Sequence, residues 1–212
     1  MIYDTTTTMG KYWHLRDWWK LIHDTFCEYV ECNVKLFNAK KAELDKRYDE
    51  CQDKADFANI WMEEGELYNY ILLRSALNAG LMYIFSQFEK QMIELARVVV
   101  PGYTPPSGGV IVDAYNSIQT KSKLELCSSC CSSWNYILDF QQIRHACVHY
   151  NGITYKRRHI EAIERLGQLL EVTERPDGGR EICLTKENLL WISDKMGYFY
   201  GLLIDELEKT KI

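Results

Sequence analysis

The sequence predicts a mainly α-helical protein that ends in a small β-hairpin and one closing helix. Three observations support this fold class. Apolar residues recur at steps of three and four along most of the chain, and glycine and proline gather in a few short stretches. Near the C-terminus one stretch alternates between polar and apolar residues instead. With 47% hydrophobic residues, the 212-residue chain can fill a substantial core, and its length predicts a single domain, 1–212.

Residues 12–65 are predicted to form a helical extension at the N-terminus. No glycine or proline occurs between Gly10 and Gly65, and the apolar residues keep helical spacing. One helix of about 50 residues would extend roughly 75 Å, which is long for a domain of this size. We therefore predict a break at 33–38 that divides the stretch into two helices. The charged run 40–54 is interpreted as a solvated helix face.

Residues 66–99 show the clearest helical pattern, and the predicted core part of the single domain, 66–212, begins here. Pro101 and Gly102 end this helix, and three of the four prolines lie in the predicted loop 100–112. The apolar stripe that defines the helix consists of Leu67, Tyr70, Ile71, Leu77, Leu81, Ile84, Phe85, Phe88, Met92, Leu95 and Val99.

Two further helices are predicted after this loop. Residues 113–127 return weakly to helical spacing, and a stronger helix spans 134–150 with Ser133 as its N-cap. Asn151 and Gly152 follow this second helix, and this pair is a common C-terminal signal.

The C-terminal part is predicted to form a helix, a hairpin and a closing helix. Residues 158–170 have helical spacing. The segments 169–173 and 180–185 alternate around Arg-Pro-Asp-Gly-Gly, so the hairpin occupies about 169–185. Thr185 is placed to cap the last helix, which continues through Leu207.

Composition and charge exclude some classes of protein. The formal net charge of −5 argues against a generic basic nucleic-acid coat protein, although it allows a nuclease with one cationic cleft. No run of about 18 apolar residues predicts a membrane span. The first ten residues lack the features of a signal peptide, so a cytoplasmic location with reduced cysteines is expected, without a membrane partner.

Three cysteines lie close together at Cys127, Cys130 and Cys131. A C-x2-C pair can contribute to a zinc site, but a structural site needs four ligands and no second pair follows. We therefore expect a turn here, with no metal and no cofactor. A cysteine-rich metal protein stays open as an alternative and would contain bound zinc.

Residues 143–152 concentrate the chemistry of the chain, because Arg144, His145 and His149 occur within six positions. At about 100° per residue, these three side chains share one polar arc of a helix. Phe140, Ile143, Ala146 and Cys147 fall on the opposite arc and should face the core. Val148 is the apolar exception inside the polar arc, which favours a position beside a partner subunit.

This arc offers the groups that metal-free RNA cleavage needs. A histidine can move protons at the 2′- and 5′-oxygens near neutral pH, and a guanidinium can stabilise charge on the phosphoryl oxygens. A symmetric dimer would supply a second histidine. The alternative is structural: Arg144 pairs with an acidic residue, while His145 and His149 make ordinary surface or helix-end contacts.

The motif and its context resemble the HEPN family of helical domains. Ile143-Arg-His-Ala-Cys-Val-His-Tyr-Asn-Gly152 is similar to the family's R-x4-H motif, in which Asn, Asp or His follows the arginine. The context is similar too: an apolar helix that contains Glu89 is followed by a loop and then by a Trp-led helix that ends in the motif. The hairpin and closing helix, 169–207, resemble a prokaryotic subgroup, so the similarity covers about 66–212.

The resemblance implies an antiparallel helical bundle that forms a homodimer and cleaves RNA without metal, in toxin–antitoxin or anti-phage defence systems. Arg144 and His149 would be the catalytic pair, His145 the orienting residue, and Glu89 a supporting acid. Lys156, Arg157 and Arg158 would track the RNA backbone, or else form a solvated basic turn. An antitoxin or another defence subunit would be a further partner. The alternative function is a noncatalytic HEPN-like module for nucleotide binding or protein interaction.

Overall fold

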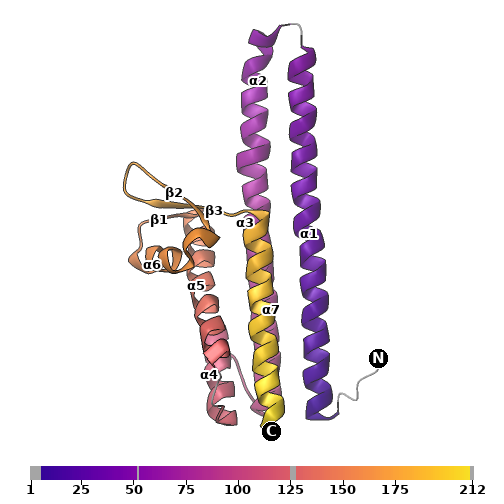
Figure 1. Ribbon diagram of the computed structural model, residues 1–212, viewed down its shortest axis with the longest axis vertical. Helices are drawn as coiled ribbons and strands as arrows, with labels where there is room; N and C mark the ends of the chain where they lie inside the picture. Colours follow the sequence, from indigo (N-terminus) through magenta and orange to yellow (C-terminus); the bar gives the residue numbers. More distant parts are fainter. Residues whose placement is uncertain (1–5, 52, 125–127, 211–212) are drawn as a thin grey trace. The chain divides into compact units, whose positions relative to one another are not determined.

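The computed structural model of the chain describes residues 6–51, 53–124 and 128–210 (Figure 1). Its α-helices account for most of these residues, which confirms the mainly α class. In chain order the elements are α1 (Thr8–Glu50), α2 (Lys54–Glu66), the π-helix η1 (Leu67–Leu72), α3 (Leu73–Val99), α4 (Val110–Ser122), α5 (Ser128–Tyr150), β1 (Ile153–Thr154), α6 (Arg157–Leu166), the 3₁₀-helix η2 (Gly167–Leu169), β2 (Glu171–Glu174), β3 (Arg180–Cys183) and α7 (Lys186–Lys209).

The chain divides into two compact units that interleave along the sequence. Unit 1 consists of 1–25, 83–142 and 191–212, and unit 2 consists of 26–82 and 143–190. Helices α1, α3, α5 and α7 therefore each contribute one stretch to each unit. The sequence-based division between an N-terminal extension, 12–65, and a core, 66–212, differs from this partition and stays a prediction.

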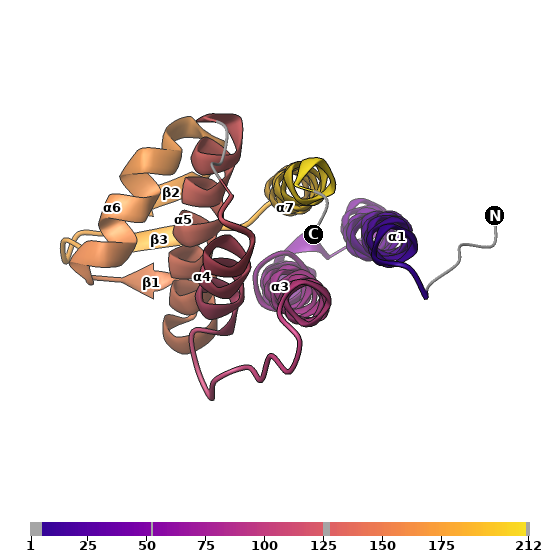
Figure 2. The ribbon, with the colours of Figure 1, turned by 90° about the horizontal axis from the view of Figure 1, so that it is seen from below.

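Unit 1 is a helical bundle with an aromatic core. Figure 2 looks along its helices α1, α3 and α7. The indole ring of Trp19 meets the ring of Phe88 edge-on, with 5.6 Å between ring centroids, and Tyr200 lies 6.0 Å from the same indole. Tyr115 of α4 stacks on Trp134 of α5 at 4.0 Å. These large rings are mostly buried, so they supply much of the hydrophobic stabilisation of the unit.

Two glycines of α7 differ sharply in the room around them, and this difference gives a testable prediction. A Cβ atom on Gly197 would lie 2.5 Å from Nε1 of Trp19, whereas a Cβ atom on Gly201 would meet nothing within 4 Å. Gly197→Ala should therefore destabilise the protein by about 1–3 kcal/mol through overpacking. Gly201→Ala should stabilise it by up to about 1 kcal/mol, because alanine is the better helix former. Urea unfolding of both variants checks the prediction, and equal effects at the two positions would contradict it.

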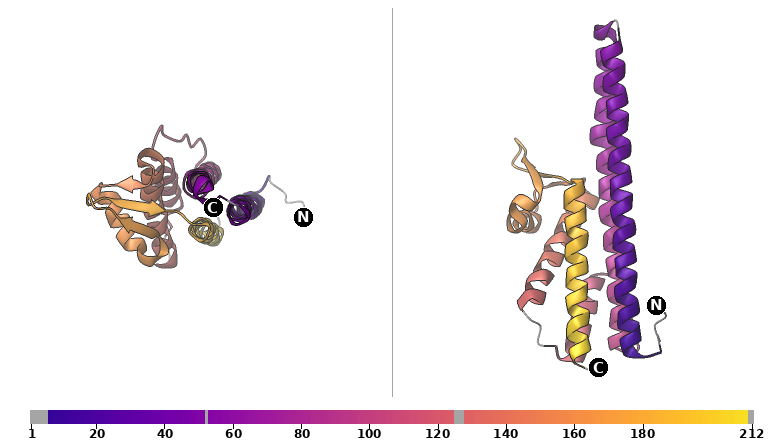
Figure 3. Two further views of the ribbon diagram at one scale, coloured as in Figure 1. Left: turned by 90° about the horizontal axis from the view of Figure 1, so that it is seen from above. Right: turned by 45° about the vertical axis from the view of Figure 1, so that its right-hand side comes forward.

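In unit 2 the second half of α1 runs antiparallel to α2 and η1, as the right-hand view of Figure 3 shows. The indole N–H of Trp61 donates to Asp45 at 2.9 Å, and the same ring lies 5.3 Å from the ring of Tyr48. Arg47 and Glu64 form an ion pair at 3.3 Å. Helix α1 is thus covered by a returning helix along this stretch.

The predicted break at 33–38 is wrong, because α1 continues without interruption from Thr8 to Glu50. The prediction relied on the expected size of a compact domain, and nothing in 33–38 itself disfavours a helix. The α1–α2 pairing stabilises the longer helix, and the chain reverses only between Glu50 and Lys54. The helical character of 12–65 is otherwise confirmed.

The small sheet of unit 2 has the strand order β1-β3-β2 and is antiparallel throughout. Val172 pairs with Ile182 in the predicted hairpin, and Ile153 pairs with Glu181 on the other side of β3. Helix α6 lies over one face of this sheet (Figures 1 and 2). The hairpin is therefore confirmed, but it belongs to a three-stranded sheet whose first strand has only two residues.

Two predicted helix caps have opposite outcomes. Ser133 is not an N-cap, since α5 already begins at Ser128 and Ser133 is buried within it. Thr185 does cap α7: its hydroxyl accepts from the backbone N–H of Asn188 at 3.2 Å. The Asn188 side chain accepts from the Thr185 N–H at 2.9 Å in return.

Most other predicted boundaries hold to within a few residues. The helix predicted at 66–99 forms as η1 and α3, and the one at 158–170 forms as α6 and η2. The one at 113–127 forms as α4, which ends at Ser122, and residues 125–127 of that prediction lie outside the described residues. Among the described residues, no helix is both long enough and apolar enough to cross a membrane.

Candidate functional site

The motif occupies the last two turns of α5, and its placement follows from which side of the helix is apolar. Ile143 and Ala146 are fully buried and Cys147 nearly so, as predicted for the core-facing arc. His149 is exposed, and Val148, the predicted exception, is 39% exposed. Arg144 and His145 are half-buried at the edge between these two sides.

The end of α5 is fixed by its backbone. Asn151 and Gly152 both have positive φ angles, 49° and 77°, and the Gly152 N–H donates to the carbonyl of Ala146 at 3.1 Å. This confirms the predicted C-terminal signal. The turn directs the chain into β1 and then α6, so that residues 156–159 come back to the motif.

Three histidines and a tyrosine form the centre of the site. The ring of His145 lies 4.6 Å from that of His149, 5.0 Å from that of His159 and 5.7 Å from that of Tyr150, measured between centroids. His149 is the exposed member of this group and His159 is 0% exposed. We call His145, His149, His159 and Tyr150 the histidine cluster.

Two of the three predicted RNA-binding residues lie against the cluster. Nη2 of Arg158 is 3.4 Å from Nε2 of His145. The Lys156 ammonium lies 4.5 Å from the ring centroid of Tyr150 and donates to its hydroxyl group. Arg157 is also exposed, but its Nε donates to Glu161 at 2.7 Å, so it is engaged along α6.

The electrostatic surroundings of the cluster are basic. Burial lowers the pKa of His145, and Arg158, His149, Lys156 and Arg144 lower it further. Every charged neighbour that acts on this imidazole is therefore a basic group, so His145 is neutral at pH 7. Such a concentration of basic groups is suited to a phosphate group.

Burial also lowers the pKa of His159, to about 4, and His145, Arg158 and Lys156 act in the same direction. Its Nδ1 atom is 2.7 Å from the hydroxyl oxygen of Thr154, which is itself buried. His159 is therefore neutral and hydrogen-bonded, and it lies in the buried layer next to the motif.

Glu89 belongs to unit 1, whereas the motif belongs to unit 2. Glu89 lies on α3 and is half-buried. Its supporting role stays a prediction from the resemblance.

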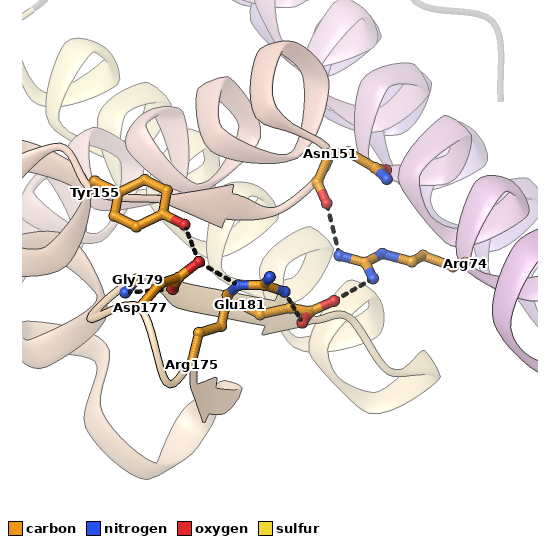
Figure 4. Close-up of polar contacts among 7 residues, drawn as sticks. All are labelled: Arg74, Asn151, Tyr155, Arg175, Asp177, Gly179 and Glu181. Atoms are coloured by element: carbon orange, nitrogen blue, oxygen red, sulfur yellow. Dashed lines mark hydrogen bonds and ion pairs between the residues drawn. The ribbon is translucent and has the colours of Figure 1, made fainter.

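An ion-pair network holds the turn after the motif, as Figure 4 shows. Arg74 donates through Nη2 to the carbonyl of Asn151 at 2.6 Å and through Nη1 to Glu181 at 2.5 Å. Arg175 donates to the other carboxylate oxygen of Glu181 at 3.3 Å. Both side chains of the Arg74–Glu181 pair are only 20% exposed. The network connects α3, the end of α5 and β3 within unit 2.

Glu181 gives a prediction about pH. The hydrogen bond from Arg74 lowers the pKa of Glu181 below its ordinary value of 4.5, and this outweighs the opposing effect of burial. The carboxylate therefore contributes its full stabilisation above pH 4.5 and loses it as the pH falls through the lowered pKa. Unfolding by urea should show that Glu181→Gln loses stability relative to wild type at pH 7, and that the difference shrinks below about pH 4.5. Glu171→Gln, at an exposed position of β2, is the control; a difference for Glu181→Gln that does not change with pH would contradict the linkage.

The cysteine cluster lies partly outside the described residues, because Cys127 is not among them. Cys130 is buried and Cys131 is exposed, both within α5 rather than in the predicted turn. Within the described part of the chain, no three His, Cys, Asp or Glu side chains are grouped so that they could hold a metal ion.

Sequence reasoning missed three residues of the site. His159 could have been found, because it precedes the buried Ala162, Ile163 and Leu166 by three, four and seven positions and so belongs to the apolar face of α6. Tyr150 adjoins the motif. Arg74 gave no signal, since its contacts with Asn151 and Glu181 are remote in sequence.

Comparison of the chain with protein-family models, with curated proteins and with solved structures finds no match. The fold and the site thus define the chain as a mainly α protein with a small antiparallel sheet and a basic histidine cluster.

Proposed function

We propose that the chain is a metal-independent endoribonuclease of the HEPN type that acts as a homodimer, with a role as a toxin or an anti-phage defence component. One observation supports this most strongly. The R-x4-H motif lies beside a second basic segment, so that Arg158 approaches His145 to 3.4 Å. Burial lowers the pKa of His145, and the charged groups that lower it further are all basic.

The proposed reaction is an attack by the ribose 2′-hydroxyl on the adjacent phosphorus. The 2′-hydroxyl loses its proton to a neutral imidazole, and the 5′-oxygen receives a proton as its bond to phosphorus breaks. The products are a 2′,3′-cyclic phosphate and a 5′-hydroxyl. His149 is the proton-transfer group in this scheme because it is exposed to an external ligand. Arg144 and Arg158 stabilise the charge on the phosphoryl oxygens.

The position of the basic residues on α6 also favours an anionic ligand. Lys156 is the N-cap of this helix, and Arg157 and Arg158 begin its first turn, which contains no acidic residue. Cations at a helix N-terminus oppose the helix dipole, at a cost of about 0.3–1 kcal/mol each. A bound phosphate would reverse this cost, because it interacts favourably with both the dipole and the cations.

The proposed homodimer supplies the second histidine that acid–base catalysis needs. Val148, His149 and Tyr150 are exposed in succession at the end of α5. An exposed valine between motif residues fits a surface that a second copy covers. In this proposal each chain contributes half of a composite site.

The experiment is RNA cleavage by the purified chain, with and without EDTA, followed by analysis of the product ends. Cyclic phosphate and 5′-hydroxyl ends in both conditions, with no cleavage of a 2′-deoxy substrate, are expected. Sedimentation at the concentration of the assay should show a dimer. Cleavage that requires a divalent metal, or 5′-phosphate products, would contradict the mechanism.

The second candidate is a noncatalytic HEPN-like module that binds another protein, such as an antitoxin. It is favoured by the exposed apolar side chains of α1, α2 and η1. These side chains are Trp13, Trp18, Leu21, Leu36, Ile60, Trp61, Met62, Leu67, Ile71 and Leu72. A purified chain that leaves RNA intact at all concentrations would favour this module.

A further inference from the structure

We propose that Thr154 and His159 are positioning residues, which keep His145 neutral with its Nε2 atom as the acceptor for Arg158 and so leave proton transfer to His149. This inference assigns roles within the site and rests on the proposed function for its catalytic part. Its structural part states which ring nitrogen carries the hydrogen on the buried His159 and on the half-buried His145, and this part can be tested without RNA.

The direction of the Thr154–His159 hydrogen bond follows from the other contact of the hydroxyl group. The backbone N–H of Lys156 donates to the Thr154 oxygen at 3.2 Å. The hydroxyl hydrogen is then available for Nδ1 of His159 at 2.7 Å, and Thr154 has no other hydroxyl contact within the described residues. If Nδ1 carried the hydrogen instead, both the hydroxyl hydrogen and the lone pair on Nε2 of His159 would be buried without a partner in that part of the chain. Donation by Thr154 leaves only one such group, so it is the favoured arrangement.

The hydrogen on His145 follows in the same way. Arg158 can only donate, so Nε2 of His145 accepts at 3.4 Å and the hydrogen of the neutral ring is on Nδ1. The His145 ring lies between those of His149 and His159. Since Nε2 is directed to Arg158, His145 has no free nitrogen for a proton from the substrate. It instead orients the guanidinium group toward the motif.

His159 contributes by remaining uncharged directly beneath His145. Its side chain is 0% exposed, and its Nδ1 atom is hydrogen-bonded to Thr154 of β1, the strand that follows the motif helix. Arg144, Lys156 and Arg158 are the charged groups that act on the two rings, and His149 and Tyr150 are further titratable neighbours. A hydrogen-bonded neutral ring at this position keeps the spacing between His145 and Arg158 without adding another positive charge.

The test replaces the hydroxyl group while keeping the shape of the side chain. Thr154→Val removes the donor to His159, Thr154→Ser retains it, and Thr173→Val on the exposed strand β2 controls for the change from threonine to valine in a strand. Long-range ¹H–¹⁵N correlation spectra identify which ring nitrogen carries the hydrogen. Wild type and Thr154→Ser should show hydrogen on Nε2 of His159 and on Nδ1 of His145, with no titration of His159 between about pH 6 and 8. Thr154→Val should leave Nδ1 of His159 without its donor, so the ¹⁵N signal of this atom should shift toward that of an unbonded imidazole nitrogen.

The same variants are then assayed for cleavage. Thr154→Val should lower kcat by roughly ten- to a hundredfold with little change in KM, as expected for a misplaced catalytic group. Thr154→Ser and Thr173→Val should retain wild-type kcat. Hydrogen on the opposite nitrogens in the wild type, or an unchanged kcat in a Thr154→Val protein whose His159 Nδ1 signal has shifted, would overturn the inference. An inactive wild-type chain with the stated hydrogen positions would overturn the proposed function instead, and circular dichroism shows whether each variant is folded.

Discussion

Replacing His149 with alanine is expected to abolish RNA cleavage while leaving the protein folded. The loss should be roughly 10²–10⁴-fold in kcat, the usual contribution of a positioned acid–base group. His149 is exposed and makes its ring contacts with His145 and Tyr150 at the end of α5, so its removal should change stability by no more than about 1 kcal/mol. Any inhibition of growth by the expressed chain should disappear in parallel.

The matched control is His14→Ala, which removes an exposed histidine of α1 in unit 1. It should cleave RNA like the wild type. Added imidazole should restore part of the activity of His149→Ala, because the small molecule can replace the missing proton-transfer group. Full activity of His149→Ala would refute the assigned role even if the chain is a ribonuclease.

The largest loss of stability is expected for Gly152→Ala, at the turn that ends the motif helix. The φ angle of Gly152 is +77°, and an added Cβ atom would lie 2.8 Å from Nη2 of Arg74 and 2.9 Å from the carbonyl oxygen of Ile182. The Ile182 N–H also donates to the Gly152 carbonyl at 3.0 Å, so β3 cannot move away without losing that bond. Left-handed strain and overpacking together should cost about 2–5 kcal/mol.

Gly178→Ala separates the two contributions to this cost. Gly178 has a φ angle of +82°, but nothing lies within 4 Å of an added Cβ atom. It should lose only the conformational part, about 1–2 kcal/mol. Chemical unfolding measured on both variants checks the prediction. Equal losses at Gly152 and Gly178 would show that the contacts with Arg74 and Ile182 do not constrain the turn.

Local patterns predicted the helices well because these elements are defined by spacing and by end signals. Asn151 and Gly152 ended α5 as expected, and Thr185 capped α7 through its hydroxyl group. The predicted break at 33–38 failed for a physical reason: the length of α1 is stabilised by the helix that pairs with it, and that pairing has no local signature. Strand β1 was missed because two residues cannot show a period.

The candidate site was predictable where its residues share one helix or follow the motif closely in sequence, as Lys156 and Arg158 do. Arg144, His145 and His149 follow from a projection of α5, and so does the exposure of Val148. The remaining parts reach the motif through the fold. His159 arrives because β1 and α6 return the chain to α5, and Arg74 contacts Asn151 across a large separation in sequence. Long-range contacts of this kind leave no mark on the spacing of a single element.

The interleaving of the two units has a consequence for cutting the chain. A cut in the loop between α3 and α4 would divide both units. The N-terminal piece would hold 1–25 and 83–99 of unit 1 together with 26–82 of unit 2, and the C-terminal piece would hold the remaining parts of both units. Neither piece contains a whole unit, so neither can form a complete core alone. Two such fragments expressed together could rebuild each core only by associating, which makes this loop a natural position for a split version of the protein.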